Sequence, residues 1–109
     1  MHKLSQEMRI SIRKKIIERL NSGEAVKIRD DYTIEYVSLV GSNTFTLEQL
    51  QKSVDGYIEV YPDRLFDNSI VFVDEEGLLK NKKPNILFKD LFNINIVGDA
   101  IIVPVTMIN

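Results

Sequence analysis

Apolar residues recur with a helical period at the start of the chain and predict a helix over residues 4–21. An apolar side chain occupies every fourth position of this segment, and no glycine or proline interrupts it. Ile10 and Ile17 widen the apolar stripe, so we expect the helix to contact more than one surface. An Asn-Ser-Gly sequence at residues 21–23 supplies the stop. The stripe consists of Leu4, Met8, Ile12, Ile16 and Leu20.

Alternating apolar and polar residues replace the helical period in residues 25–40. This pattern predicts two short strands joined by a turn at Asp30-Asp31. A Gly-Ser-Asn turn at residues 41–43 follows, and it lacks the spaced glycines and the lysine of a phosphate-binding loop. The alternating positions are Val26, Ile28, Tyr32, Ile34 and Tyr36.

A second helix is predicted over residues 47–54, with Thr46 as its N-cap and Gly56 as the left-handed residue that ends it. Residues 57–61 then alternate as a strand. This strand stops at Pro62, because proline has no backbone N–H to donate to a neighbouring strand.

The most strand-like run of the chain is residues 69–73. We expect it to continue through a hairpin loop at residues 74–77, with Gly77 at positive φ, into a return strand that begins at residues 78–80.

Two further elements are predicted near the C-terminus. Residues 85–92 suit one or two helical turns with Asn85 as the N-cap. After a turn at residues 96–99, the nearly continuous apolar run 100–108 indicates a strand that is covered on both faces. Pro104 favours an edge position for this strand or a bulge near its end.

These elements predict an α+β fold: a small mixed or antiparallel sheet, one or two short packing helices, and an additional N-terminal amphipathic helix. The chain contains neither a repeat nor a low-complexity linker. We therefore expect a single domain over residues 1–109, with residues 1–23 as a helical extension and residues 25–109 as the α+β body.

Charge is divided unevenly along the chain. Residues 1–29 hold eight basic and three acidic side chains, a net charge of +5, whereas residues 30–109 hold six basic and thirteen acidic side chains, a net charge of −7. This division favours docking of the basic helix on the acidic body of its own chain or of a second copy. Direct nucleic-acid binding is not favoured, because the domain as a whole has no basic excess. Membrane binding is not favoured either, because the helix has no Trp or Phe anchor.

The sequence lacks the residues that several classes of catalysis and metal binding require. The sequence has no cysteine, and its single histidine, His2, stands near the end of the chain, where it cannot be held against a nucleophile. No dinucleotide-binding glycines, zinc-ligand spacing or calcium-binding loop is present. We therefore expect a protein that is not an enzyme, with no catalytic residue, metal or cofactor. The absence of cysteine, of a secretory signal and of a membrane-length apolar run indicates a cytoplasmic protein.

Carboxylates offer the remaining route to catalysis. Five acidic residues fall within a short segment, and two or three of them converging would make a Mg²⁺ site for a metal-assisted phosphoesterase. The competing interpretation is that they are solvated loop residues. The five are Asp63, Asp67, Asp74, Glu75 and Glu76.

One face of the strand at residues 57–61 is a candidate binding surface. Tyr57, Glu59 and Tyr61 share this face, whereas Ile58 and Val60 point the other way and are predicted to be core. Tyrosine is common at interfaces, so the face suits a protein or small ligand. The N-terminal helix lying across the same face is the alternative explanation.

The blocks LEQLQKSVDGYIEV, VFVDEEGLLKNKKPN and IVGDAIIV occur in an order that resembles a family of small proteins carried by bacteriophages, plasmids and integrated elements, known only as a domain of unknown function. The resemblance covers about residues 34–104 and leaves the first helix outside. Ile86-Leu87-Phe88 depart from the small residues that the family often has there. The matching residues are Leu47, Leu50, Gly56, Tyr57, Ile58, Glu59, Asp74, Glu75, Gly77, Pro84, Asn85, Gly98 and Asp99.

The resemblance implies a small accessory protein of a mobile element, in the cytoplasm of a bacterial host, and no particular activity. We hypothesise a non-enzymatic binder of a host macromolecule or a nucleotide-like ligand that acts as an inhibitor of an antiviral defence. The alternatives are the phosphoesterase, using Asp63, Asp67 or Asp74, and a structural or regulatory homo-oligomer formed through the helix at residues 4–21. The proposed binding residues are Tyr57, Glu59, Tyr61, Asp74, Glu75 and Asn85.

Overall fold

An antiparallel sheet with helices on both faces organises residues 4–108, the part of the chain that the computed structural model describes. The sheet has the strand order β2-β1-β5-β4-β3, and each pair of neighbours runs antiparallel. The α+β prediction is confirmed. The elements are α1 (Gln6–Asn21), β1 (Ala25–Ile28), β2 (Ile34–Val37), α2 (Leu47–Val54), β3 (Ile58–Val60), β4 (Ser69–Asp74), α3 (Ile86–Phe92), β5 (Ala100–Pro104) and the 3-10 helix η1 (Val105–Met107).

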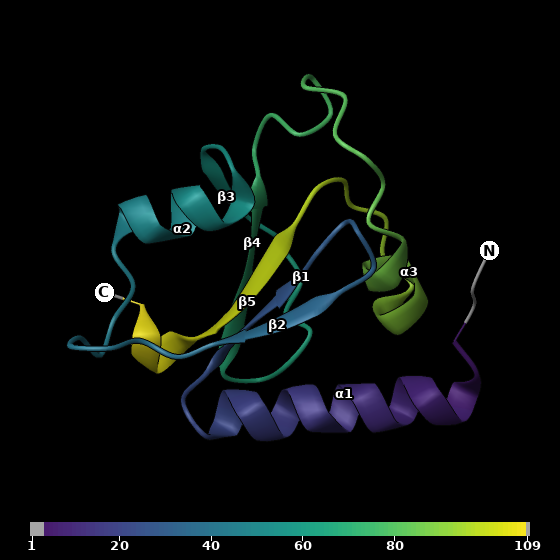
Figure 1. Ribbon diagram of the computed structural model, residues 1–109, viewed down its shortest axis with the longest axis horizontal. Coiled ribbons are helices and arrows are strands. Elements are labelled where there is room, and N and C mark those ends of the chain that lie inside the picture. The colour runs from purple at the N-terminus through teal and green to yellow at the C-terminus, as the bar shows by residue number, and fades with distance from the viewer. Residues whose placement is uncertain (1–3, 109) are drawn as a thin grey trace.

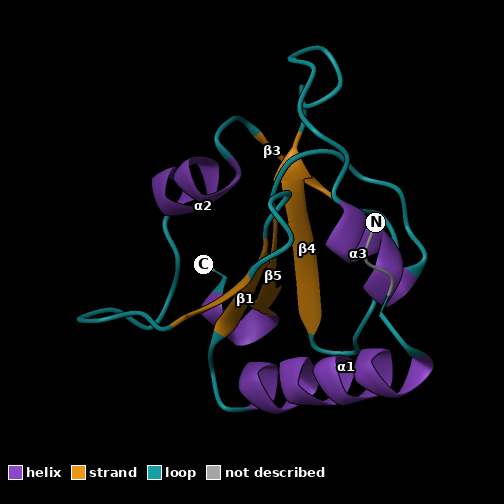
Figure 2. Cartoon of the chain, turned by 45° about the vertical axis from the view of Figure 1, so that its right-hand side comes forward, coloured by secondary structure: helices purple, strands orange, loops and turns teal. Residues whose placement is uncertain are grey.

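The core consists of two clusters, one on each face of the sheet. Helix α2 lies on one face, and α1 and α3 lie on the other (Figures 1 and 2). Successive residues of β5 alternate between the clusters: Ile102 packs with Ile16 and Phe88, whereas Ile101 packs with Leu50 and Phe72. All five residues of β5 are buried, which confirms that the last strand is covered on both faces.

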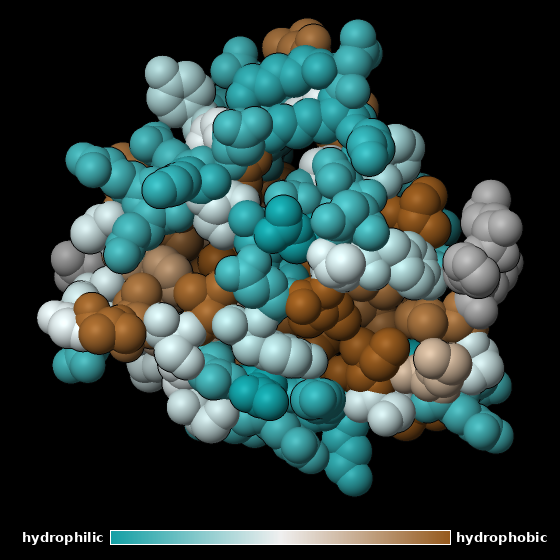
Figure 3. All heavy atoms as spheres, viewed as in Figure 1, coloured by the Kyte–Doolittle hydropathy of each residue, from teal (hydrophilic) through white to brown (hydrophobic). Residues whose placement is uncertain are grey.

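Helix α1 docks on the sheet of its own chain. Ser5 caps it by accepting a hydrogen bond from the Met8 N–H, and Ile16 and Leu20 bury their side chains against β1 and β5. Met8, which the stripe predicts to be covered, is 53% exposed. Arg19 stacks 4.6 Å from the ring centre of Tyr36. Apolar surface stays visible between α1 and α3 on the side of β2 (Figure 3).

Helix α2 has the bounds that its sequence predicts, but the left-handed residue that follows it lies one position earlier than predicted. Thr46 and Gln49 form a capping box, in which each side chain accepts a hydrogen bond from the other residue's N–H. The left-handed residue at the end is Asp55, with φ 58°, so the assignment of that conformation to Gly56 is wrong. Gly56 is needed for space instead, because a Cβ there would lie 2.6 Å from a carboxylate oxygen of Asp74.

Three strand predictions are corrected by the fold. Tyr32 belongs to the turn between β1 and β2, with φ 69°. Val60 is 51% exposed, because β3 is the edge strand and α2 covers only Ile58 on that face. Pro104 ends a central strand, at a position where β5 pairs with β4 but β1 no longer reaches.

The predicted hairpin after β4 is also wrong. Residues 75–81 form successive turns without a return strand, and Gly77 does not have positive φ. This segment is the green loop that projects at the top of Figure 1. It exposes two adjacent apolar side chains, Leu78 at 79% and Leu79 at 83%. The helical prediction after it is confirmed, with Asn85 as the N-cap of α3.

Candidate functional site

A surface pocket of about 630 Å³ lies between the edge strand β3, the end of β4 and helix α3. We call it the β3–α3 groove. It brings together five of the six residues proposed from sequence: Glu59, Tyr61, Asp74, Glu75 and Asn85. Its other lining residues are Pro62, Val73, Leu78, Pro84, Ile86, Lys89, Asn95, Ile96 and Val97.

The strand wall of the groove is set by the alternation of β3. Glu59 pairs with Val73 of β4, and its exposed side chain lines the groove together with Tyr61. Tyr61 is half-buried against the core, and its N–H donates to the Val71 carbonyl at 2.9 Å. No ion pair engages Glu59 or Glu75 within the described chain. The two carboxylates are therefore available to a partner.

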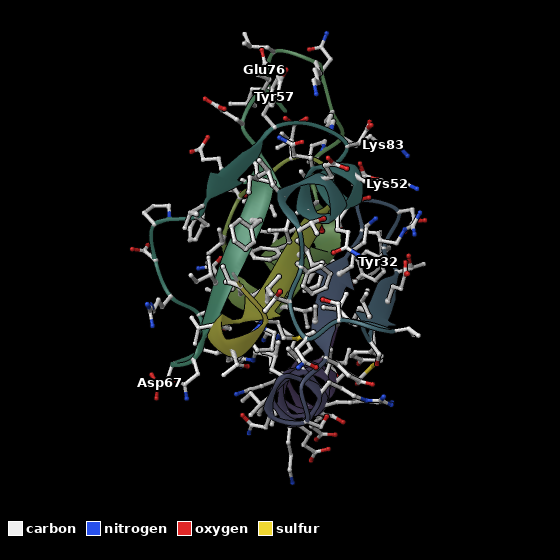
Figure 4. The ribbon with its side chains drawn as sticks, turned by 90° about the vertical axis from the view of Figure 1, so that its left-hand side faces the viewer. Tyr32, Lys52, Tyr57, Asp67, Glu76 and Lys83 are labelled. Carbon is white, nitrogen blue, oxygen red and sulfur yellow. The ribbon has the colours of Figure 1, made fainter. Side chains whose placement is uncertain are left out.

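Tyr57 lies outside the groove and is not covered by α1. It is 64% exposed and borders a separate depression of about 330 Å³ with Lys52 and Lys80. Figure 4 shows Tyr57 at the end of the molecule opposite to α1, which is seen end-on at the bottom. The expectation that the N-terminal helix lies across Tyr57 is therefore wrong.

Asp74 has its carboxylate occupied by two lysines. The side chain is completely buried, with Lys82 Nζ at 2.6 Å and Lys80 Nζ at 2.9 Å from the same oxygen. Its other oxygen accepts from the Glu76 N–H at 2.9 Å. Lys82 Nζ also donates to two carbonyls at the C-terminal end of α2, at 2.7 and 2.9 Å. These contacts tie the loop at residues 75–83 to both β4 and α2.

The electrostatics of this cluster favour the charged carboxylate. Burial raises the pKa of Asp74, but the hydrogen bonds from Lys82, the Glu76 backbone and Lys80 outweigh burial and lower the pKa to about 2. The hydrogen bond to Asp74 raises the pKa of Lys80. Asp74 is thus a permanent anion at neutral pH, and its partners lie within its own chain.

Asn85 is also held by internal contacts. It is 1% exposed, and its side-chain amide donates to the carbonyls of Ile28 at 2.9 Å and Gly98 at 2.8 Å. Its Oδ1 accepts from the Phe88 N–H at 2.9 Å. Asn85 therefore fixes the wall of the groove by joining β1, the turn before β5 and α3. The neighbouring Asp99 has a similar task, because its Oδ1 accepts from the Asp30 N–H at 2.8 Å.

The helix wall of the groove was not foreseen. Ile86, 38% exposed, and Lys89 face the groove from α3, and Leu78 contributes from the loop. Of the run Ile86-Leu87-Phe88, only the first residue faces the groove, because Leu87 and Phe88 are buried in the core. The usable signal was the helical period, because Ile86 stands three and four positions before the polar Lys89 and Asp90 and so shares their face of the helix.

The acidic residues of the metal hypothesis are not brought together. Asp63 and Asp67 precede β4, whereas Asp74 ends it, and a six-residue strand spans about 20 Å. Figure 4 shows Asp67 and Glu76 at opposite ends of the sheet. Among residues 4–108, no three His, Asp or Glu side chains are grouped so that they could hold a metal ion. His2 lies outside the described residues.

Comparison with known proteins identifies a family. Residues 23–107 match the family model described as "Domain of unknown function (DUF3846)". Since the match spans most of the chain, the protein belongs to this family, and α1 lies outside the matched segment. No curated protein and no solved structure matches the chain. In residues 4–108, no helix has the length and apolar character needed to cross a membrane.

Proposed function

We propose that this DUF3846 member works without catalysis, by binding a host protein in the β3–α3 groove. The observation that carries the proposal is the combination of a largely apolar pocket with two carboxylates, Glu59 and Glu75, that have no partner within the described residues. Exposed apolar side chains at the rim, Leu78 and Ile86, extend the surface that a partner can bury.

The chemistry of the groove supports binding over catalysis. Asp74 and Asn85, its two buried polar residues, have their polar atoms engaged by the protein itself. A general acid or base must instead reach a substrate proton. A nucleotide-like ligand is less well supported, because Lys80 and Lys82 are held by Asp74 and leave Lys89 as the cation of the groove.

The setting of this binding is a further part of the proposal. The resemblance to proteins carried by phages and plasmids supports action in the cytoplasm of a bacterial host. We propose a protein of an antiviral defence system as the class of target, which the groove would occupy and inhibit.

A selection from random displayed peptides tests the groove as the binding site. We expect peptides that bind the wild-type protein and lose affinity for Ile86→Glu, which places a charge at the rim. The matched control is Val40→Glu, because Val40 is 96% exposed and lies outside the groove. Failure to enrich any peptide, or equal binding to both variants, would refute the proposal. A thermal-shift screen of nucleotides tests the small-ligand alternative, which a concentration-dependent rise in Tm would revive.

Self-association through α1 is a second candidate, favoured by one observation. Ile10 and Ile17, seven residues apart and so on one face of the helix, are 52% and 42% exposed. Because Ile16 belongs to the core, removing the helix would unfold the protein, and substitution is the better test. Light scattering of the double variant Ile10→Lys/Ile17→Lys beside the wild type tests this candidate. A smaller mass for the variant supports the oligomer, whereas a monomeric mass for both proteins refutes it.

A further inference from the structure

We infer that the occupant of the β3–α3 groove is an extended segment of the partner protein, with basic and apolar residues in alternation, that adds as a strand to the open edge of β3. This inference rests on the proposed function and specifies the class of ligand. Three observations carry it: the direction of the backbone groups of β3, the unpaired carboxylates beside them, and the apolar surface on both faces of the edge.

Two residues of β3 turn their backbone hydrogen-bonding groups away from the sheet. Tyr57 accepts from the Glu75 N–H at 2.8 Å, and Tyr61 donates to the Val71 carbonyl at 2.9 Å. In an antiparallel pair, alternate residues turn their backbone groups toward the same neighbour. The residues between, Ile58 and Val60, therefore direct their N–H and C=O groups away from β4. Since β3 ends the strand order, these groups face an edge that no described strand occupies.

The side chains at this edge define the charge of the segment. Glu59 is exposed, lines the groove and has no ion-pair partner among residues 4–108, and the same is true of Glu75. A residue directly opposite Glu59 on an added strand would have its Cβ about 5 Å away, where an opposite charge is favourable. Lys or Arg fits that position.

The apolar positions of the segment follow from the alternation of a strand. Val60, on the face of α2, is half-exposed because β3 is the edge strand, and an apolar residue of the added strand would cover it. On the groove face, the next basic residue, two positions along, would lie toward Tyr61 and the rim at Ile86, where its aliphatic stem packs on the apolar surface while its charge stays in water. Backbone pairing supplies affinity in such complexes, and the side chains supply specificity.

The edge can be blocked without disturbing the fold. Val60→Pro removes an N–H that points away from β4, so the ladder to β4 stays intact, and proline is tolerated at such positions. Val60→Thr is the matched control, because it keeps the N–H and a β-branched side chain of similar size. Glu59→Lys reverses the charge at an exposed position and serves as a second, independent variant.

Fluorescence anisotropy with two labelled peptides, one of alternating valine and lysine and one of alternating valine and glutamate, tests the inference. We expect the lysine peptide to bind the wild type and Val60→Thr equally, and to bind Val60→Pro up to about tenfold more weakly, as the loss of one hydrogen bond implies. Glu59→Lys should prefer the glutamate peptide. Equal binding of both peptides to the wild type, or full binding to a folded Val60→Pro, would overturn the inference.

The outcome separates this inference from the function on which it rests. If peptides from the random selection lose affinity for Ile86→Glu but are insensitive to Val60→Pro and Glu59→Lys, the groove binds a partner in another mode. In that case the added strand is wrong and the proposed function stands.

Discussion

Replacing Asp74 by asparagine should lower the free energy of unfolding by about 3 kcal/mol. The carboxylate is fully buried and lies 2.6 Å from Lys82, whose side chain is only 15% exposed. Removing one partner of a buried ion pair typically costs about 3–5 kcal/mol, because the remaining charge is left unpaired. Lys80 is 41% exposed and can turn toward water, which places the expected loss at the lower end of that range.

Urea unfolding followed by circular dichroism measures this loss. In thermal unfolding of a domain of about 100 residues, a loss of 3 kcal/mol corresponds to a fall in Tm of roughly 12–24 °C. Asp67→Asn is the matched control, since Asp67 is exposed in the connection before β4, and its effect should stay within about 0.5 kcal/mol.

A second substitution separates the ion pair from other effects of the asparagine. Lys82→Met added to Asp74→Asn removes both charges of the shortest contact, and we expect the double variant to be more stable than Asp74→Asn alone. A loss below about 1 kcal/mol for Asp74→Asn, or no recovery in the double variant, would refute the assignment of Asp74 as the charged centre that holds the loop.

Three further predictions concern the same framework. The pKa of Asp74 is lowered from 3.8 to about 2 in the folded protein, so its contribution of ~2 kcal/mol to the free energy of unfolding is present at neutral pH and is lost as the pH falls from about 4 toward 2. Acid titration of the wild type should show this loss of stability. The same loss in Asp74→Asn would show that Asp74 is not its cause. Asn85→Ala leaves two carbonyls and one N–H without their partner and should cost about 3 kcal/mol in urea unfolding; a loss near zero would mean that water replaces the side chain. Gly56→Ala should cost about 1–3 kcal/mol through its clash with the Asp74 carboxylate, measured as a lower Tm, and an unchanged Tm would show that the carboxylate moves freely.

Local sequence signals predicted most of the fold. Thr46 and Asn85 were identified as N-caps because a capping side chain bonds to the backbone only three residues away. The central strand β5 was predicted because a nearly continuous apolar run implies cover on both faces. The sequence does not show where a strand lies within the sheet. Val60 was therefore predicted to be core, and Pro104 was predicted to mark an edge strand or a bulge, whereas β3 is the edge strand and β5 is central.

Long-range contacts explain what the sequence could not predict. Leu78 and Leu79 suggested a return strand, but the loop that carries them is held by Lys80 and Lys82, which reach a carboxylate and the end of α2. Such ion pairs leave no periodic pattern. The same limit applies to the site: five proposed residues share one groove, yet two of them, Asp74 and Asn85, serve its framework, and the wall from α3 was missed.

The most direct test of the account is an amide chemical-shift map of the protein with the tightest peptide from the random selection. Binding in the β3–α3 groove predicts that the largest shifts fall in residues 58–61 and at the start of α3, with little change in α1 or β2. Largest shifts in α1 or β2, with β3 and α3 unaffected, would contradict it.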